Sequence, residues 1–321
     1  MRFAIMCFVM IFAWPTYAAQ TAPNTPAKSK SYVNASAAKS APAVKSQRKV
    51  AARTTATRSA SRAAVPKQLA LHSSSAIVID QLSGTVVYDK NADEQVPIAS
   101  LTKLMTAMVV MDAKLPLDEL VRVSSDDIDR LRGSRSRLPV GTQLPRRELI
   151  RLALMASENR AASALGRVYP GGPSAFIAAM NRKARTLGLT RTNFADSSGL
   201  SSSNVSTARE LSRIVAAAYD YPIIREYSTD DSSKVKLPRY AAPVQFRNTN
   251  GLVKNRTWDI GLSKTGYTSD AGHCLVMQAD IANRPLILVL LDSWGKNSRI
   301  GDANRIRKWV ERNPTKLQLA G

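Results

Sequence analysis

Cysteine and histidine are scarce in this chain, which has two of each among 321 residues. Cys7 falls in an apolar run at the N-terminus, and removal of that run leaves Cys274 alone, which excludes an intramolecular disulfide. Cys274 has no histidine–asparagine partner pattern, so we expect a small apolar strand residue rather than a nucleophile. His72 and His273 with one cysteine do not suffice for a zinc site, and we expect no metal and no other cofactor.

Acidic residues are absent from the first 79 positions, although the whole chain carries 46 lysines and arginines and 24 aspartates and glutamates. Residues 1–18 combine a charged start, a short apolar run and small residues, which is typical of a secretory signal peptide that is removed on export. Residues 19–68 are rich in alanine, serine and lysine without apolar periodicity, which predicts a disordered basic tail. For an exported protein we expect no nucleic acid partner, and at most loose attraction of the tail to a membrane or an anionic polymer.

The rest of the chain, residues 69–315, is expected to form one domain. Short β-rich runs joined by the turn residues QLSG predict a hairpin, and runs with apolar residues at helical spacing follow. An almost wholly apolar run near the end is typical of a strand covered on both faces. This order predicts an α+β fold, with a mainly antiparallel sheet covered by helices and an inserted helical subdomain. The expected strands are 76–80, 85–89, 257–266, 273–281 and 285–293, and the expected helices begin near Ser100, Pro145, Phe176, Thr207 (with a TARE capping box) and Ser298.

The stretch PIASLTKLMTA places Ser100 and Lys103 at the start of an apolar helix. A serine hydroxyl is a weak nucleophile until a base takes its proton. Positions i and i+3 of a helix are neighbours, so Lys103 can reach the Ser100 hydroxyl, and apolar surroundings at Ala99 and Ala107 would keep its amine uncharged. Taken alone, such a pair is far more often a capping serine followed by a snorkelling lysine than a catalytic pair. The same S-x-x-K pattern also begins at Ser36, Ser46, Ser233 and Ser293.

Two later tripeptides complete a set with SLTK. SEN begins at Ser157, after an expected helix, and KTG begins at Lys264, in an expected strand. Asn159 can hold a substrate amide, and Ser157 can relay a proton between Lys103 and a leaving amine. Lys264 can bind a substrate carboxylate while its charge helps to keep Lys103 neutral. Gly266 allows an extended backbone to approach a substrate closely.

In this order, SLTK, SEN and KTG resemble the three motifs of serine-type penicillin-binding proteins and β-lactamases. The longer stretches PIASLTKLMTA, ASENRAASALG, DSSGLSSSN and SKTGYTSDAG are similar to low-molecular-weight penicillin-binding proteins, the D-alanyl-D-alanine carboxypeptidases and endopeptidases. The segment GSRSRLPVGTQL resembles the periplasmic endopeptidase members. The resemblance covers about residues 77–310 and implies a β-lactamase/transpeptidase-like fold, which agrees with the order of expected elements.

The resemblance also implies a role for each motif residue. Ser100 matches the nucleophile that becomes acylated, Lys103 matches its proton acceptor, and the backbone N–H groups of Ser100 and Tyr267 match the oxyanion hole. The catalytic residues implied are Ser100, Lys103 and Ser157, and the substrate-binding residues implied are Asn159, Lys264, Thr265, Gly266 and Tyr267. The implied enzyme is a periplasmic D-alanyl-D-alanine endopeptidase that hydrolyses peptidoglycan cross-links, and β-lactams are its implied covalent inhibitors.

Three alternatives remain open from the motifs. A D-alanyl-D-alanine carboxypeptidase that trims pentapeptide stems carries the same three motifs. We rank a β-lactamase lower, because no clear glutamate-bearing loop of the class A kind follows SEN. An inactive wall-binding module is also ranked lower, because Ser100, Lys103 and Lys264 are all intact. The chain ends at Gly321, so we expect neither the further β domain nor the C-terminal membrane anchor that many carboxypeptidases carry.

Two polar clusters outside the motifs are expected to be structural. The acidic stretch SSDDID has neither the glycine nor the distal glutamate of a calcium loop, so we expect a surface charge network with the arginines that follow. Those arginines can also line the substrate groove; they are Arg130, Arg132, Arg135 and Arg137. DSSGLSSSN is expected to be a polar loop that shapes the helical subdomain.

Overall fold

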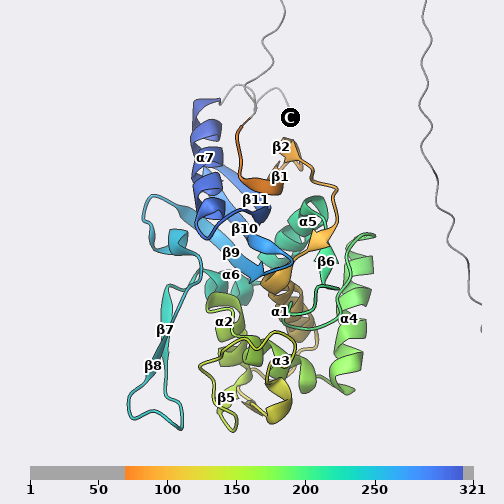
Figure 1. The fold of residues 1–321 in the computed structure, drawn as a ribbon, viewed down its shortest axis with the longest axis vertical. Helices are drawn as coiled ribbons and strands as arrows, with labels where there is room; N and C mark the ends of the chain where they lie inside the picture. Colours follow the sequence, from red (N-terminus) through yellow and green to blue (C-terminus); the bar gives the residue numbers. More distant parts are fainter. Residues whose placement is uncertain (1–68, 314–321) are drawn as a thin grey trace, which may run out of the picture. The chain divides into compact units, whose positions relative to one another are not determined.

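A computed structural model describes residues 69–313 of the chain. The signal peptide and the basic tail expected for residues 1–68 lie outside these residues, as do residues 314–321. The described part is an α+β structure with an antiparallel sheet, as predicted (Figure 1).

Five antiparallel strands form the central sheet. The predicted hairpin is its first part, and Asp80 holds the turn by accepting backbone hydrogen bonds from Leu82 (3.1 Å) and Ser83 (3.0 Å). The three predicted C-terminal strands are also found, and each pairs antiparallel with the next. The order across the sheet is β2 (Val86–Lys90), β1 (Ser73–Asp80), β11 (Arg284–Ser293), β10 (Gly272–Ile281) and β9 (Asp259–Thr268).

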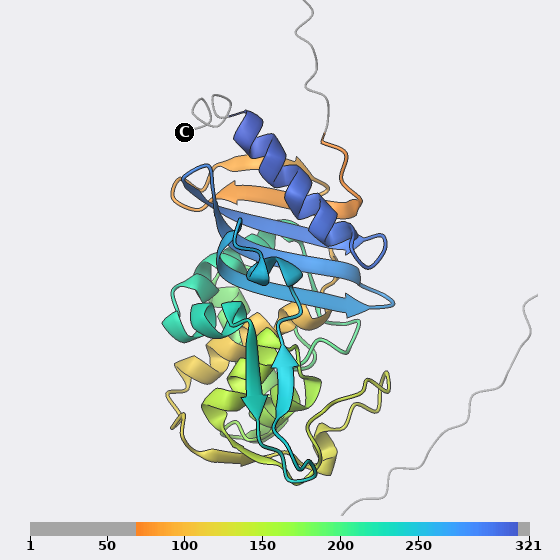
Figure 2. The same ribbon diagram turned by 90° about the vertical axis from the view of Figure 1, so that its left-hand side faces the viewer.

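Both faces of the sheet are buried, which confirms the prediction made from the apolar run in β11. Successive side chains of a strand point to opposite faces. Leu288 therefore packs in a cluster with α7 (Ser298–Arg312), whereas its neighbour Val289 belongs to the larger core that contains α5 (Ala208–Tyr219). Figure 2 shows α7 lying across one face of the sheet, with the other helices behind it.

The helical subdomain is formed by segments between the hairpin and β9 and lies below the sheet in Figure 1. At its centre runs α1 (Thr102–Asp112), in which every residue from Thr102 to Val110 is buried. A helix enclosed in this way has no solvent-facing side for a lysine to reach. The helices around α1 are α2 (Arg146–Met155), α3 (Asn159–Arg167), α4 (Gly172–Thr186) and α6 (Pro222–Thr229).

Three short strand pairs complete the described part. The pair β7–β8 forms an arm that stands beside α2 (Figure 1). Three 3₁₀ turns, η1 (Ala99–Leu101), η2 (Ser125–Asp127) and η3 (Gly251–Lys254), join the longer elements. The strand pairs are β3 (Val96–Pro97) with β6 (Val205–Ser206), β4 (Leu120–Arg122) with β5 (Gln143–Pro145), and β7 (Ser232–Val235) with β8 (Val244–Arg247).

Two local expectations need correction. Pro145 is the last residue of β5 and not part of the helix, because Arg146 N–H still donates to Glu119 O (2.9 Å) and holds the chain extended up to that point. The TARE capping box is only half formed. Thr207 Oγ1 accepts from Glu210 N–H (3.0 Å), but the Glu210 carboxylate instead accepts hydrogen bonds from the segment 190–192.

The acidic stretch SSDDID is also different from the surface network that we expected. Asp127 is buried, where its carboxylate accepts from Ser124 N–H (2.8 Å) and pairs with Arg167 (3.0 Å). Its partner is thus a residue of helix α3 and none of the four arginines in residues 130–137. The charge is buried because η2 packs against α3.

Cys274 is a buried residue of β10, which confirms its prediction as a strand residue. Its thiol donates to Ala271 O (3.3 Å), and burial raises its pKa to about 11, so the thiolate is not formed at neutral pH. Between residues 69 and 313 no helix has both the length and the apolar character needed to cross a lipid bilayer.

Candidate active site

The nucleophile candidate lies at the junction between η1 and α1. Ser100 is the middle residue of η1 and is partly accessible, whereas Lys103 lies one turn later and is fully buried. Ala99, which precedes the serine, has φ +47°, a left-handed conformation that is costly for a residue with a side chain. This sharp entry into α1 presents the Ser100 side chain at the end of a buried helix.

Lys103 Nζ has three contacts, each at 2.7 Å, with Ser100 Oγ, Asn159 Oδ1 and Ser198 O. The carbonyl oxygens of Asn159 and Ser198 can only accept hydrogen bonds. An uncharged amine has two N–H groups and one lone pair, so these two oxygens use both N–H groups. The lone pair is then left for the Ser100 hydroxyl, which is the only one of the three neighbours that can donate a proton.

The electrostatic surroundings favour the uncharged amine. Burial lowers the pKa of Lys103 to about 7, against a partial opposing effect from the carboxylates of Asp196 and Glu158. The uncharged form of the amine is therefore accessible near neutral pH. A position beside Ser100 and a lowered pKa are what general-base chemistry by Lys103 would need.

The SEN turn joins α2 to α3 and faces both buried lysines. Asn159 Oδ1 accepts from Lys103, and Asn159 Nδ2 donates to Ser134 Oγ (2.9 Å), which fixes the orientation of the amide. Ser157, with φ +58°, accepts from Lys264 Nζ (2.9 Å). The hydroxyl that we expected beside Lys103 is thus bonded to the second lysine, and Asn159 is the SEN residue that contacts Lys103.

KTG lies on β9, which borders the Ser100 turn. Lys264 is buried and donates to Ser157 Oγ and to Thr265 O (both 2.9 Å). Burial lowers its pKa, and the positive charges of Lys103 and Arg299 lower it further. Two lysines that share a site in this way disfavour each other's charged form.

Gly266 explains how the strand comes so close to the nucleophile. A Cβ atom on Gly266 would lie 3.0 Å from Ile98 O and 3.2 Å from Ser100 N. The missing side chain allows the β9 backbone to pack directly against η1. Tyr267, the next residue, is exposed and stacks on His273 with ring centroids 4.3 Å apart. Its backbone N–H thus belongs to the strand segment that borders Ser100.

The DSSGLSSSN loop is part of the site, which sequence reasoning missed. Ser198 supplies the backbone acceptor for Lys103, and a Cβ on Gly199 would lie only 1.9 Å from Ala99 O. Asp196 holds this loop, because its carboxylate accepts from the N–H groups of Ser198 (2.6 Å), Gly199 (2.6 Å) and Ser201 (2.7 Å). The glycine that follows Ser197 and Ser198 was the available signal, since only glycine fits so close a backbone contact.

Arg299 of α7 is a second missed residue. Its Nη1 contacts Gly266 O (3.3 Å) and His273 Nδ1 (3.0 Å), so the guanidinium lies behind KTG. Its buried Nε has no hydrogen-bond partner among the described residues. The sequence predicted only a helix that begins near Ser298, in which an arginine gives no special signal.

The loop after η2 closes one side of the site. Arg132 donates through Nε to Leu200 O (2.5 Å) and pairs with Asp270, in the turn between β9 and β10. Ser134 of the same loop contacts Asn159. The arginine-rich segment therefore borders the Ser198 loop and the SEN turn, and its expected role in lining a substrate groove stays a prediction.

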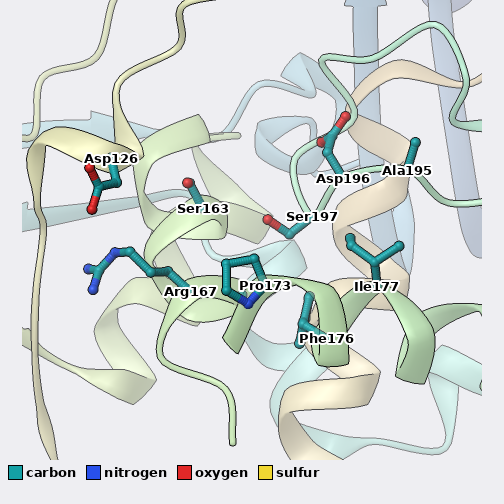
Figure 3. Close-up of a pocket in the computed structure, with 10 residues that line it drawn as sticks. Asp126, Ser163, Arg167, Pro173, Phe176, Ile177, Ala195, Asp196 and Ser197 are labelled. Carbon is teal, nitrogen blue, oxygen red and sulfur yellow. The ribbon is translucent and has the colours of Figure 1, made fainter. Parts of the chain in front are cut away.

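A separate cavity of about 240 Å³ lies behind the 195–197 segment (Figure 3). Asp126 and Arg167 lie at one end and Ile177 at the other. Because Ser197 lines this cavity while the carbonyl of Ser198 contacts Lys103, the loop separates the cavity from the nucleophile. Residues 69–313 contain no group of three side chains suited to bind a metal ion.

Comparisons with known proteins agree on one kind of protein. The family description "D-alanyl-D-alanine carboxypeptidase", peptidase family S11, matches residues 59–295. A D-alanyl-D-alanine endopeptidase of Pseudomonas aeruginosa is 49% identical over 78% of this chain and 81% of its own length. One of Escherichia coli K12 is 46% identical over 78% and 80%. The crystal structure of the Streptomyces K15 DD-transpeptidase superposes with a TM-score of 0.69, at 29% identity, over 75% of this chain and 97% of that one.

Proposed function

The chain belongs to peptidase family S11, the D-alanyl-D-alanine carboxypeptidases, and we propose that it is a D-alanyl-D-alanine endopeptidase that cuts peptidoglycan cross-links. It is a serine-type DD-peptidase by family. The two relatives that support the endopeptidase activity carry that name and align over most of this chain. The observation that carries the mechanism is the set of three contacts around Lys103 Nζ, which leaves its lone pair to Ser100.

In the proposed acylation step, the uncharged Lys103 amine takes the proton of the Ser100 hydroxyl. Ser100 Oγ then bonds to the D-alanyl carbonyl carbon, and the carbonyl oxygen becomes an oxyanion. We assign the backbone N–H groups of Ser100 and Tyr267 to that oxygen, because β9 packs against η1 at this point. These groups stabilise negative charge that is present only after attack.

The leaving amine must then receive a proton. Lys103 holds the proton that it took from Ser100, and its amine lies at the reacting oxygen. Lys103 returns this proton to the leaving amine, and the bond between that amine and the D-alanyl carbonyl carbon breaks; Ser157, bonded to Lys264, is the hydroxyl that we assign as a relay on the KTG side. A water molecule deprotonated by Lys103 then hydrolyses the ester and restores Ser100.

Substrate binding is assigned to the KTG side. In the proposed reaction the leaving amine belongs to a diamino acid of the neighbouring stem, and that residue carries a carboxylate. Lys264 and Thr265 lie at the groove, and the unpartnered Nε of Arg299 lies behind them. Binding of a carboxylate here would raise the proton affinity of Lys264, because an anion offsets the burial that lowers its pKa.

We also propose that the enzyme works in the periplasm after removal of residues 1–18. The charged start and short apolar run of this segment support export. Cell fractionation of the full chain, with N-terminal sequencing of the product, tests this: a mature N-terminus near Ala18 in the periplasmic fraction is expected, and retention of Met1 in the cytoplasm would refute it.

The central experiment is digestion of purified cross-linked muropeptide dimers and pentapeptide monomers by the full mature chain. We expect dimers to be converted to monomers, with Ser100→Ala inactive. Release of D-alanine from pentapeptides with dimers left intact would instead make the protein a carboxypeptidase, the alternative that shares its motifs. Labelled penicillin supplies a control. It should acylate the wild type to give an adduct that is released only slowly, and it should leave Ser100→Ala unlabelled. Rapid turnover of the penicillin would indicate a β-lactamase.

A further inference from the structure

Two basic segments of the chain meet beside the SEN turn. Residues 130–143 contain four arginines and no acidic residue, and residues 232–247, which form the β7–β8 arm, contain two lysines, two arginines and no acidic residue. Arg137 joins them: its Nη1 donates to Gln245 O (2.9 Å), and its guanidinium lies 4.1 Å from the centre of the Phe246 ring. Positive charge from two distant parts of the sequence is thus concentrated at one place.

A cavity of about 390 Å³, which we name the SEN-side cleft, opens between these segments. It continues directly from the residues that contact the two buried lysines. Glu158 supplies its only carboxylate, and that group is already engaged by Ser136 Oγ (2.7 Å) and lies 3.5 Å from Arg137 Nε. The lining residues are Arg135, Ser136, Arg137, Ala156, Ser157, Glu158, Asn159 and Tyr240.

Part of the positive charge at the cleft is not used by the fold. Arg135 is exposed, and its side chain has no hydrogen bond or ion pair within residues 69–313. The same holds for Lys234, Lys236 and Arg239 on the neighbouring arm. Tyr240 adds a partly exposed aromatic ring at the rim. Like charges held together without partners oppose folding, so their presence beside a catalytic site indicates an anionic ligand.

We propose that the SEN-side cleft binds an acidic peptide segment of the substrate, through carboxylates that lie beyond the residues held at Ser100. This rests on the proposed function, because a cross-linked substrate extends far past the scissile bond. Guanidinium groups bind carboxylates in a planar, two-point geometry, and Arg135 is free to do so. Tyr240 offers an apolar surface to the peptide between its charged groups.

Binding measured with Ser100→Ala protein tests the proposal without any turnover. The probe is a synthetic cross-linked stem dimer with free carboxylates, compared with the same dimer in which the carboxylates are amidated. We expect Arg135→Glu, added to Ser100→Ala, to weaken binding of the acidic dimer about fivefold and to leave binding of the amidated dimer unchanged. The loss should shrink in high salt, because exposed charges are screened.

Matched controls separate the possible outcomes. Arg182→Glu, an exposed arginine of α4 without a side-chain partner, should have no effect on either dimer. An equal loss for acidic and amidated dimers, or no loss for either, would overturn the proposal. So would a loss of binding to phosphatidylglycerol vesicles with dimer binding unchanged, since the cleft would then face lipid. If Arg135→Glu does not fold, equal affinity of the Ser100→Ala protein for the two dimers overturns it.

The same measurements distinguish failure of the endopeptidase proposal from failure of the SEN-side cleft proposal. Tight binding of the acidic dimer by Ser100→Ala, together with failure of the wild type to cut it, would refute the endopeptidase assignment and leave the cleft supported. Cleavage of the dimer with no dependence on its carboxylates would do the reverse.

Discussion

Asp302 and Lys103 are both fully buried, on opposite faces of the central sheet, yet their surroundings are opposite. The Asp302 carboxylate, on α7, accepts hydrogen bonds from Ser73 N–H (2.7 Å), Ser73 Oγ (2.6 Å) and His72 N–H (3.0 Å), with Arg305 at 3.5 Å. Every one of these neighbours is a hydrogen-bond donor or a cation. Lys103, in contrast, has three uncharged neighbours and no ion pair.

The difference shows two uses of a buried ionisable group. At Asp302 the donors offset the cost of burial, and the carboxylate fastens α7 to the start of β1. At Lys103 the cost is offset only in part, so the pKa of the amine falls to about 7, which suits the base that we propose. Equal burial therefore stabilises the fold in one region and provides reactivity in the other.

Removing each buried group in turn tests whether Lys103 serves reactivity and Asp302 serves stability. The first variant is Lys103→Met. We expect the rate of penicillin acylation to fall about 10³-fold or more, because Ser100 loses its base. Stability should stay level or rise, since a buried amine without a counter-charge is replaced by an apolar side chain of similar length. The pKa of Lys103 is lower in the folded than in the unfolded chain, so this gain should be complete at and below about pH 7 and should vanish as pH rises above 10.

Thermal unfolding across that pH range, measured beside acylation rates, checks this prediction. A variant that is both inactive and markedly less stable would show that Lys103 is mainly structural. Ser100→Ala serves as the control, since it removes the nucleophile and leaves the buried lysine in place.

The acceptors around Lys103 depend on close backbone packing, which Gly199→Ala would disturb. Its Cβ would meet Ala99 O at 1.9 Å, and Gly199 also has φ +84°. We expect the loop to shift, the Ser198 carbonyl to leave Lys103, and acylation to fall about 100-fold. Gly84→Ala, also at positive φ but with open space around its Cβ position, is the matched control and should retain full activity. Unchanged acylation in Gly199→Ala would mean that the loop does not orient the base.

On the other face, Asp302→Ala should act on stability alone. Ser73 and His72 would lose a buried acceptor, and we expect a loss of about 3 kcal/mol in the free energy of unfolding. Arg305→Ala, which removes only the partly exposed partner, should cost about 1 kcal/mol or less. Denaturant unfolding measures both changes. Acylation per folded molecule should stay within about threefold of the wild type, and a much larger loss would show that the two regions are not independent.

The smallest expected effect is a shift in pH dependence. Below about pH 7 the Lys103 amine is protonated, so the apparent acylation rate constant should fall about tenfold per pH unit on the acid side. The Glu158 carboxylate raises the pKa of Lys103, and Glu158→Gln should therefore move this midpoint to lower pH by a few tenths of a unit. Penicillin acylation followed from pH 5 to pH 8 measures the midpoint. A shift to higher pH would contradict the assignment of Lys103 as the titrating base.

Much of the fold could be predicted because it follows from local periodicity. The turn residues between β1 and β2 and the two-faced apolar run of β11 each depend on neighbouring residues only, and both expectations were correct. The failures had a non-local cause. Glu210 has the spacing of a capping box, but the segment 190–192 supplies better donors to its carboxylate than the helix end does.

The candidate site divides in the same way. Ser100, Lys103, Ser157, Asn159 and Lys264 could be named from short motifs, because each contributes a side chain of recognisable chemistry, and the structure brings them together. Ser198 acts through its main-chain oxygen, and Gly199 through the side chain that it does not have. A main-chain oxygen leaves no sign in the residue type, and the glycine by itself did not show which backbone it would approach.

The order of residues along the chain was thus sufficient to identify the chemical groups, the strands and helices that carry them, and the family they resemble. Only the folded arrangement decided that Lys103 is enclosed on every side, that Ser157 contacts Lys264, and that arginines from one loop meet the β7–β8 arm. The reason is physical: the charge state of an amine and the partner of a hydroxyl depend on solvent access and on atoms that are distant in sequence, which folding alone brings within reach.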